Sequence, residues 1–403
     1  MKLHRNMALG ILSALEETFT QQKSAAEIIQ KTLKSNRGWG SRDRKMIAKA
    51  FYDILRNKML YETLAERQSS ANPYWGLIAI WLLLNDHDLP QWPEFIIRDR
   101  DKVKTYAQVL IKQRTYKYSI PEWLDQKGVI AFGEKNWTQE IAALNRPAKL
   151  IIRCNTLRTS TKQIKQILEE KHQISTDFIP EYPDALILDK HRPLKDLEEY
   201  RKGLFEIQDA NSQKIAPWLK PQPGKFYIDA CAGAGGKSLH LASLTHDRAK
   251  ILALDIVPSK LQELKKRCER NKILSIETLC IQDQNTLHQL AEGADGVLID
   301  APCSGLGVLK RNPDTKWSIN PKRLLEITKT QAQILQTYAS KVKKGGLLVY
   351  ATCSILPEEN SMQVSKFLNS KWGADFELEK EHTYFSHLTD FDGFYCARMI
   401  KKM

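Results

Sequence analysis

Residues 225–238 read KFYIDACAGAGGKS, an apolar run that leads into a loop with three glycines. The run has the composition of a buried strand, and the pattern SLHLASL at 238–244 is typical of a helix. Gly233, Gly235 and Gly236 let the backbone approach a ligand closely, and the N-terminus of the following helix favours a negatively charged group. This stretch therefore predicts a strand, a loop and a helix that together form a binding site.

The same alternation of strand and helix continues to the end of the chain. Apolar strands that are each followed by an amphipathic helix are typical of a parallel sheet covered on both faces. The expected pairs are 225–230 with 238–244, 250–256 with 259–271, 276–282 with 287–292, 296–302 with 323–342, and 345–353 with 359–371. Such sheets bind ligands outside the carboxyl ends of their strands. The predicted fold class is α/β, with a Rossmann-like domain over 223–403.

The chain before residue 223 follows two other patterns. Apolar residues recur at helical spacing in 7–19, 24–34, 41–67 and 74–85, which predicts a helical domain over 1–144. Strand patterns at 146–155, 184–189 and 203–209, with a helical pattern at 161–171, predict a small α+β module over 145–222. Three domains are therefore expected, which agrees with a length of 403 residues.

The charge balance favours a polyanionic partner. The chain has 61 Lys and Arg against 47 Asp and Glu, a formal net charge of +14. Residues 1–60 hold 12 Lys and Arg against 5 Asp and Glu, and this surplus of 7 is half of the total. A phosphate-binding N-terminal domain and a solvated helical face explain the surplus equally well.

The cysteine pattern argues against disulfides and metal. Seven cysteines stand at 154, 231, 268, 280, 303, 353 and 396, with no CxxC pair and no metal-type spacing with histidine. Such a pattern is typical of a reducing cytoplasm, so a cytoplasmic protein with no metal is expected. The longest apolar run, 74–84, is about half of what a bilayer span needs, so it predicts a buried helix and no membrane partner. We expect a monomer.

Three classes of ligand compete for the glycine loop. A P-loop needs glycine five residues before the Gly-Lys pair, where this chain has Cys231, and a dinucleotide fingerprint needs glycine where it has Ser238. The looser glycine loop of S-adenosylmethionine enzymes remains, in which a methionine carboxylate replaces the pyrophosphate. Asp255 ends the second strand, where an acid accepts ribose hydroxyls, and Asp283 follows the third strand, where it is placed to contact adenine. These features favour a nucleoside ligand.

Two cysteines and an aspartate stand at the ends of neighbouring strands. Asp300 and Cys303 follow the fourth strand in GVLIDAPCSG, and Cys353 follows the fifth in GGLLVYATC. A structural role is the ordinary interpretation of one such cysteine, but two of them beside a nucleoside site indicate chemistry.

Methylation at C5 of a pyrimidine requires such a set of side chains. A thiolate adds to C6, C5 then attacks the methyl donor, and an acid near ring N3 stabilises the adduct. Asp300 is a candidate for that acid, and Lys237 is a candidate electrostatic helper that favours the thiolate. The pattern alone leaves open which cysteine attacks.

Four motifs together resemble the Nol/Nop/Sun family of RNA (cytosine-5) methyltransferases. They are IDACAGAGGKS, LIDAPCSGLGVLKRNPDTKW, LLVYATCSILPEENS and DGFYCARMIKK, and QDANSQ at 208–213 extends the resemblance into the middle module. The resemblance implies that Cys353 is the nucleophile and that Cys303 aids product release. It also implies that S-adenosylmethionine is held by Cys231, Ala232, Gly233, Ala234, Gly235, Gly236, Lys237, Asp255, Lys260, Asp283 and Asp300. The family usually has proline where this chain has Ala234, which alters loop stiffness but not the kind of ligand.

The helical region is similar to the NusB-like RNA-binding domain of one bacterial member of this family. That similarity rests on SRDRKMIAKAFYDILRNK at 41–58 and YSIPEWL at 118–124, and that member modifies a cytosine of small-subunit ribosomal RNA. In RNPDTKW at 311–317, Arg311 and Lys316 are candidate phosphate contacts, and Trp317 either stacks on a base or packs. The target cytosine must leave its stack, so a single-stranded or bulged target is expected.

These expectations combine into one function with two alternatives. The favoured function is methylation of C5 of a cytosine in small-subunit rRNA, with S-adenosylmethionine as donor and a covalent Cys353–C6 adduct. Transfer RNA is the alternative substrate. A non-catalytic RNA-binding or ribosome assembly factor with a methyltransferase fold is the alternative of another class, against which Cys353, Cys303 and Asp300 weigh.

Overall fold

The chain forms two compact units. The computed structural model describes residues 3–403 except 21–23, 67–71, 96, 98, 190–192, 284–289 and 291. Unit 1 combines Met1–Arg146 with Val308–Pro321, and unit 2 combines Pro147–Gly307 with Lys322–Met403. Apart from its first two residues, the predicted module over 145–222 therefore lies in the same unit as most of the predicted domain over 223–403. The division into three domains stays a prediction.

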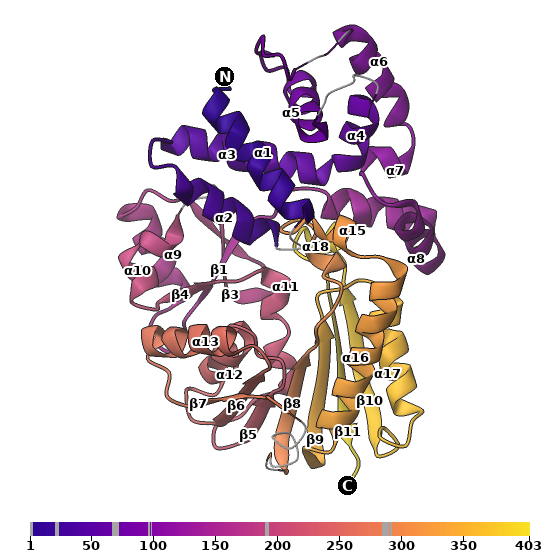
Figure 1. Cartoon of the computed structure of the whole chain (residues 1–403). Helices are drawn as coiled ribbons and strands as arrows, with labels where there is room; N and C mark the ends of the chain where they lie inside the picture. Colours follow the sequence, from indigo (N-terminus) through magenta and orange to yellow (C-terminus); the bar gives the residue numbers. More distant parts are fainter. Residues whose placement is uncertain are drawn as a thin grey trace. The chain divides into compact units, whose positions relative to one another are not determined.

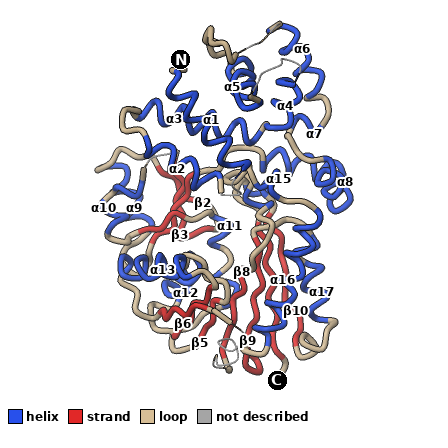
Figure 2. The backbone as a smooth tube through the Cα atoms, in the orientation of Figure 1, coloured by secondary structure: helices blue, strands red, loops and turns tan. Residues whose placement is uncertain are grey.

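Unit 1 consists of helices and loops in the part of it that the structure describes (Figure 2). Its helices are α1 (Arg5–Thr20), α2 (Ala25–Ser35), α3 (Ser41–Arg56), α4 (Lys58–Glu66), α5 (Pro73–Leu84), α6 (Arg100–Leu110), α7 (Arg114–Lys117), α8 (Glu122–Leu144) and α15 (Thr315–Ser318). Their apolar faces share one core, and α5, which is apolar nearly all round, is the buried helix predicted from residues 74–84.

The single helix predicted over 41–67 is instead two helices. They separate at Asn57, whose φ and ψ of −112° and 21° are not helical. The Asn57 side chain donates to the carbonyl of Asp53 at 3.0 Å. Such local side-chain bonds compete with the helical ladder, which explains why the apolar periodicity did not reveal the break.

Residues 308–321 belong to unit 1, although they closely follow Pro302 and Cys303 in sequence. Lys316 is 1% exposed, and its ammonium donates to the carbonyls of Arg56 at 2.8 Å and Tyr118 at 2.9 Å and to Oδ1 of Asn145 at 3.0 Å. All three N–H groups of the ammonium thus have protein acceptors. The prediction that Lys316 holds a phosphate is therefore wrong.

The neighbouring Trp317 packs within the same unit. Its indole Nε1 donates to the carbonyl of Leu55 at 2.7 Å, and the ammonium of Lys58 lies 5.1 Å from its ring centroid. Of the two alternatives weighed for Trp317, base stacking and packing, the contacts support packing.

Unit 2 contains two sheets. The smaller one has the strand order β2-β3-β1-β4 with every neighbouring pair antiparallel, and α9 and α10 lie beside it. Its strands are β1 (Leu150–Cys154), β2 (Thr176–Ile179), β3 (Tyr182–Leu188) and β4 (Phe205–Ile207), and its helices are α9 (Thr161–Glu170), α10 (Glu198–Arg201) and α11 (Ala210–Gln213). The predicted α+β module is confirmed, with β2 as an additional strand.

The larger sheet has seven strands in the order β10-β11-β9-β8-β5-β6-β7 (Figure 2). They are β5 (Phe226–Asp229), β6 (Lys250–Asp255), β7 (Ile276–Cys280), β8 (Ala294–Asp300), β9 (Val342–Thr352), β10 (Phe376–Tyr384) and β11 (Phe394–Lys401). The five predicted strands are parallel to one another, as expected. The antiparallel pair of β10 and β11 adds to them, because β11 returns beside β9 in the opposite direction. The predicted Rossmann-like fold is thus confirmed, in a mixed sheet.

Helices flank this sheet (Figure 1). The helices α16 (Pro321–Ala339) and α17 (Ser361–Leu368) bury apolar side chains against one face, where Leu335, Tyr338 and Phe367 join the core. The helix α12 (Gly236–Leu244) lies against β6, and α13 (Pro258–Asn271) lies against β6 and β7. A short helix α18 (Ser386–Thr389) precedes β11. Of the helix expected over 287–292, most residues lie outside the described ones.

Parallel strands place their carboxyl ends at one edge of the sheet, and the register of β8 and β9 determines which of their residues lie side by side there. Asp300 faces Ala351 across the two strands, so the residues that follow them begin side by side.

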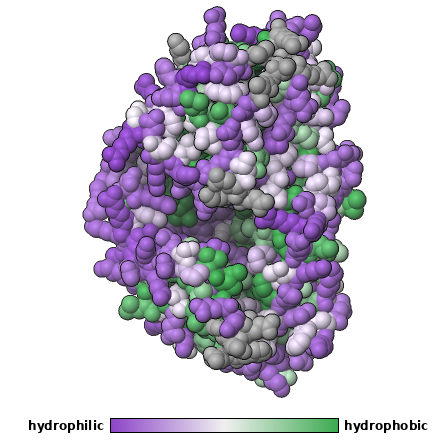
Figure 3. All heavy atoms as spheres, viewed as in Figure 1, coloured by the Kyte–Doolittle hydropathy of each residue, from purple (hydrophilic) through white to green (hydrophobic). Residues whose placement is uncertain are grey.

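Hydrophilic side chains cover most of the face shown in Figure 3. None of the helices that the structure describes is long and apolar enough to cross a bilayer.

Candidate active site

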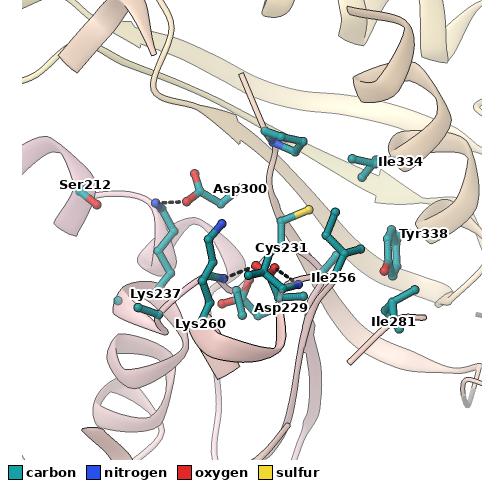
Figure 4. A pocket seen from close by; sticks show the side chains of 18 of the residues that line it. Ser212, Asp229, Cys231, Lys237, Ile256, Lys260, Ile281, Asp300, Ile334 and Tyr338 are labelled. Carbon is teal, nitrogen blue, oxygen red and sulfur yellow. Dashed lines mark hydrogen bonds and ion pairs between the residues drawn. The ribbon is translucent and has the colours of Figure 1, made fainter. Parts of the chain in front are cut away.

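A cavity of about 640 Å³ lies at the carboxyl ends of β5, β6 and β8 (Figure 4). That volume is in the range of sites for small molecules and cofactors. Its wall is formed by Ile207, Gln208, Ser212, Asp229, Ala230, Cys231, Ala232, Gly233, Ala234, Gly236, Lys237, Asp255, Ile256, Val257, Lys260, Arg267, Ile281, Asp300, Pro302, Thr330, Ile334 and Tyr338. Most of the predicted cofactor residues therefore share one cavity.

Two of the predicted cofactor residues are not on its wall. Gly235 has a φ of +84°, and a Cβ there would lie 2.0 Å from Leu264 Cδ1, so its place in the loop requires glycine for packing. Asp283 is exposed and lies two residues beyond Ile281, which does line the cavity. The adenine contact predicted for Asp283 stays a prediction.

Asp255 fixes the glycine loop to the end of β6. One carboxylate oxygen accepts from the backbone N–H of Gly233 at 2.8 Å, and the other accepts from that of Val257 at 2.8 Å. Each oxygen keeps a second lone pair, so the carboxylate can still accept ribose hydroxyls. The predicted acid thus shapes the loop and also faces the cavity.

Asp229 is a site residue that the sequence analysis missed. Its Oδ2 accepts from the Ser238 hydroxyl at 2.6 Å, whereas its buried Oδ1 has no hydrogen-bond partner among the described residues. Burial raises the pKa of Asp229 to about 7. S-adenosylmethionine carries an ammonium and a sulfonium, and a cationic group in this cavity would supply the missing partner. The cavity therefore fits that cofactor in both volume and charge. The sequence did contain a signal for this residue, because Asp229 ends a strand as Asp255 and Asp300 do.

Lys237 and Asp300 form an ion pair at the cavity wall (Figure 4). The two charged atoms are 2.5 Å apart, and Lys237 is 8% exposed. Burial alone would lower the pKa of the Lys237 ammonium, but the Asp300 carboxylate more than offsets this effect and raises it. The ion pair thereby holds a charged donor, the Lys237 ammonium, at the cavity wall. The role of Asp300 as the acid near ring N3 stays a prediction.

The two predicted catalytic cysteines lie together beside this wall. Their Sγ atoms are 3.1 Å apart, which is too long for a disulfide bond of about 2.05 Å, and both cysteines are partly buried residues. The hydrogen bond with Cys353, and then burial, raise the pKa of Cys303 well above its usual value. Either sulfur can donate in this contact. Cys353 is one of the causes of the raised pKa of Lys237, so its sulfur lies within electrostatic reach of the cavity wall.

The small sheet of unit 2 also contributes to the cavity. Gln208 and Ser212, both within the QDANSQ motif, line its wall beside Lys237 and Asp300 (Figure 4 labels Ser212). The Gln208 side chain donates to the Ser212 hydroxyl at 3.2 Å and accepts from Arg153 at 2.5 Å. The sequence had marked this motif only as part of a family resemblance.

Two arginines hold the carbonyls of the glycine loop. Arg153 of β1 donates to the carbonyl of Gly236 at 2.8 Å, and Arg267 of α13 donates to that of Ala234 at 2.6 Å. Glu206 of β4 accepts from Arg267 at 2.9 Å, so the small sheet orients this arginine. A buried network of this kind fixes the backbone that the ligand must meet.

Comparison with known proteins places this site in a family. Residues 216–400 match the family described as 16S rRNA methyltransferase RsmB/F, and residues 120–195 match the ferredoxin-like domain of RsmF/B-like methyltransferases. The chain is 33% identical over 296 residues to ribosomal RNA small subunit methyltransferase B of Yersinia enterocolitica, covering 71% of this chain and 67% of that one. The same figures hold for the protein of that name from Escherichia coli.

Solved structures agree on the fold. The crystal structure of PH0851 has a TM-score of 0.84 at 23% identity and covers 100% of both chains. The structure of NSun6 from Pyrococcus horikoshii with SFG has a TM-score of 0.64 at 20% identity and covers 70% of this chain and 98% of that one. The family match and the 33% identity to methyltransferase B show that the chain belongs to the RsmB/F family of S-adenosylmethionine-dependent methyltransferases.

Proposed function

We propose that this enzyme methylates C5 of a cytosine in small-subunit rRNA. The observation that carries the proposal is the pair of sulfur atoms 3.1 Å apart beside the Lys237–Asp300 ion pair. Methylation of an exocyclic nitrogen or a ribose oxygen needs no thiol, whereas methylation of a pyrimidine carbon needs a nucleophile at C6. The names of the relatives support rRNA as the substrate, and the net charge of +14 suits a polyanion.

The reaction uses the two cysteines in different states. S-adenosylmethionine supplies the methyl group. The hydrogen bond with Cys353 and burial raise the pKa of Cys303, so we assign Cys303 as the thiol, which donates a hydrogen bond to the Cys353 sulfur and keeps its proton. The Cys353 thiolate adds to C6 of the cytosine. This addition raises the electron density at C5, so that C5 becomes nucleophilic enough to accept the methyl group. Lys237 keeps its ammonium charged beside Asp300 and stabilises the negative charge that develops on the ring.

Release reverses the addition. A base removes the C5 proton, the C5–C6 double bond forms again, and the bond between Cys353 and C6 breaks. Cys353 leaves as a thiolate, which the thiol of Cys303 again stabilises through the same hydrogen bond. Loss of Cys303 is therefore expected to leave the adduct intact.

Unit 1 is proposed as an RNA-binding domain. A cavity of about 380 Å³ on it is lined by Arg42, Lys45, Met46, Lys49, Trp81, Asn85 and His87. Arg42 and Lys45 are exposed on α3, where cations can meet phosphates. Ribosomal RNA as substrate also implies the cytoplasm.

The test is methyl transfer to defined RNAs. The protein is incubated with methyl-labelled S-adenosylmethionine and with the small ribosomal particle, naked rRNA or tRNA, and the product is mapped by bisulfite sequencing. We expect 5-methylcytosine at one rRNA position, absent from the RNA of a deletion strain and absent with Cys353→Ala. Methylation of another atom, or of tRNA alone, would contradict the proposal. Binding of the cofactor and RNA without any transfer would instead support the non-catalytic assembly factor.

A further inference from the structure

The two cysteine loops have the same local structure. Cys303-Ser304-Gly305-Leu306 follows β8, and Cys353-Ser354-Ile355-Leu356 follows β9. In each loop the serine hydroxyl accepts from the backbone N–H of the leucine two residues later, at 3.3 Å after Ser304 and at 3.2 Å after Ser354. Each cysteine is thus the residue before a serine-capped turn.

One carboxylate joins the two turns. Glu359, at the end of a short 3₁₀ helix (Pro357–Glu359), has no exposed surface. It accepts from the Ser304 N–H at 2.7 Å, from the Ser304 hydroxyl at 2.6 Å and from the Ser354 hydroxyl at 2.5 Å. The Gln331 amide is a fourth donor at 3.1 Å. A carboxylate has about four lone-pair positions, so these four uncharged donors fill its capacity and fix its orientation.

The fourth donor connects the turns to the cofactor cavity. Gln331 lies on α16, and its amide also donates to the carbonyl of Pro302 at 3.1 Å, directly before Cys303. Thr330, Ile334 and Tyr338 of the same helix form part of the cavity wall. The helix that borders the cofactor site therefore also borders the turn that carries Cys303.

We propose that Glu359 is a positioning residue that sets the spacing of Cys303 and Cys353. This inference rests on the proposed function, since it concerns the step in which one thiol supports the other. The carboxylate touches neither sulfur by a hydrogen bond. It holds the serines that follow both cysteines, so the 3.1 Å contact between the sulfur atoms depends on it. Displacement of a reacting group by about 1 Å can cost roughly a hundredfold in rate.

The variant that tests this is Glu359→Gln. The amide has the same shape, but in place of the oxygen that accepts from both serine hydroxyls it has an NH₂ group that only donates, so both hydroxyls must rotate and the charge-assisted hydrogen bonds are lost. We expect kcat for methyl transfer to fall by about ten- to a hundredfold, while KM for S-adenosylmethionine and for RNA changes by less than about threefold. Glu326→Gln, an exposed glutamate on α16, is the matched control and is expected to behave as the wild type. Ser304→Ala removes one of the four donors and is expected to give a smaller loss.

A second measurement does not depend on methyl transfer. A short thiol–thiol crosslinker is applied to the free protein, and the bridged peptides are identified by mass spectrometry. Wild type and Glu326→Gln should bridge Cys303 to Cys353 rapidly, and Glu359→Gln should do so at least about tenfold more slowly under conditions in which its circular dichroism is that of the wild type.

The outcomes separate the two proposals. If the wild type makes no 5-methylcytosine but Glu359→Gln still slows bridging, the proposed function fails and the positioning role stands. If Glu359→Gln keeps wild-type kcat and bridging, or loses only thermal stability, the positioning role is overturned. If Glu359→Gln does not fold, the test uses Ser304→Ala instead. The positioning role then requires that Ser304→Ala folds as the wild type does but bridges Cys303 to Cys353 more slowly, and it is overturned if bridging by Ser304→Ala is unchanged.

Discussion

The segments 231–237 and 311–317 each contain one buried lysine and each follow a strand of the large sheet in sequence, yet the two lysines have different surroundings. Lys237 faces Asp300 across 2.5 Å in the cavity of unit 2. Lys316 donates to three neutral oxygens within unit 1. The pKa of Lys237 is raised by its carboxylate partner, whereas burial lowers that of Lys316 well below its usual value. The role of a lysine near a sequence motif therefore depends on the groups that its ammonium contacts, which the motif itself does not specify.

The first prediction removes the charged donor from the cavity. Lys237→Met should lower kcat by about a hundredfold or more, because the developing charge on the ring loses its stabilising partner and Asp300 is left unpaired. Cofactor affinity, measured by calorimetry, should change by only a few fold. A variant with near wild-type kcat would show that Lys237 is structural, as Lys316 is.

The second prediction concerns the other lysine. Lys316→Met should lower the free energy of unfolding by roughly 3 kcal/mol, because three buried oxygens lose their donor. Urea denaturation followed by fluorescence measures the change. Methyl transfer at a temperature where the variant stays folded should match the wild type. Unchanged stability with weaker RNA binding would restore Lys316 as a phosphate contact.

The third prediction tests the basic surface of unit 1. Deletion of residues 1–60 would be uninformative, since Met7, Ile11, Ile47 and Phe51 belong to the core of this unit. Charge reversal at the exposed Arg42 and Lys45 leaves that core intact. If both contact phosphates, the slope of log affinity against log salt should flatten by about 1.5. An unchanged slope would mean that these side chains are only solvated.

The fourth prediction follows from Asp229. Its pKa of about 7 lies above the ordinary value of 3.8, so between these values the folded, cofactor-free protein binds more protons than the unfolded chain. This contribution to stability is present below about pH 4 and is lost as the pH rises through 7. A cationic cofactor prefers the ionised carboxylate, so its affinity should rise a few fold from about pH 6 to pH 8. Asp229→Asn should flatten this profile, and an equal pH dependence in both proteins would contradict the assignment.

The fold of unit 2 was largely predictable because each strand and helix carries its own periodicity. The antiparallel β10 and β11 were not predicted. The strand β10, with its pattern FELEKEHTY, is largely exposed and polar, whereas the buried β11 was noted only as the motif DGFYCARMIKK of the family resemblance. The strand-end rule found Asp255, Asp300 and the cysteines, and the same rule would have found Asp229. It could not find Arg267 or Glu359, because their roles come from contacts between elements rather than from position along a strand. Likewise, nothing in residues 308–321 signals that they pack with unit 1.

Capture of a covalent intermediate tests directly whether Cys353 is the nucleophile. Cys303→Ala is incubated with S-adenosylmethionine and small-subunit rRNA, separated on a denaturing gel and digested for peptide mapping. We expect a stable protein–RNA species whose nucleotide is attached to the peptide that contains Cys353, and no such species with the double variant that also carries Cys353→Ala. A species attached elsewhere, or none at all while methylation continues, would contradict that role of Cys353.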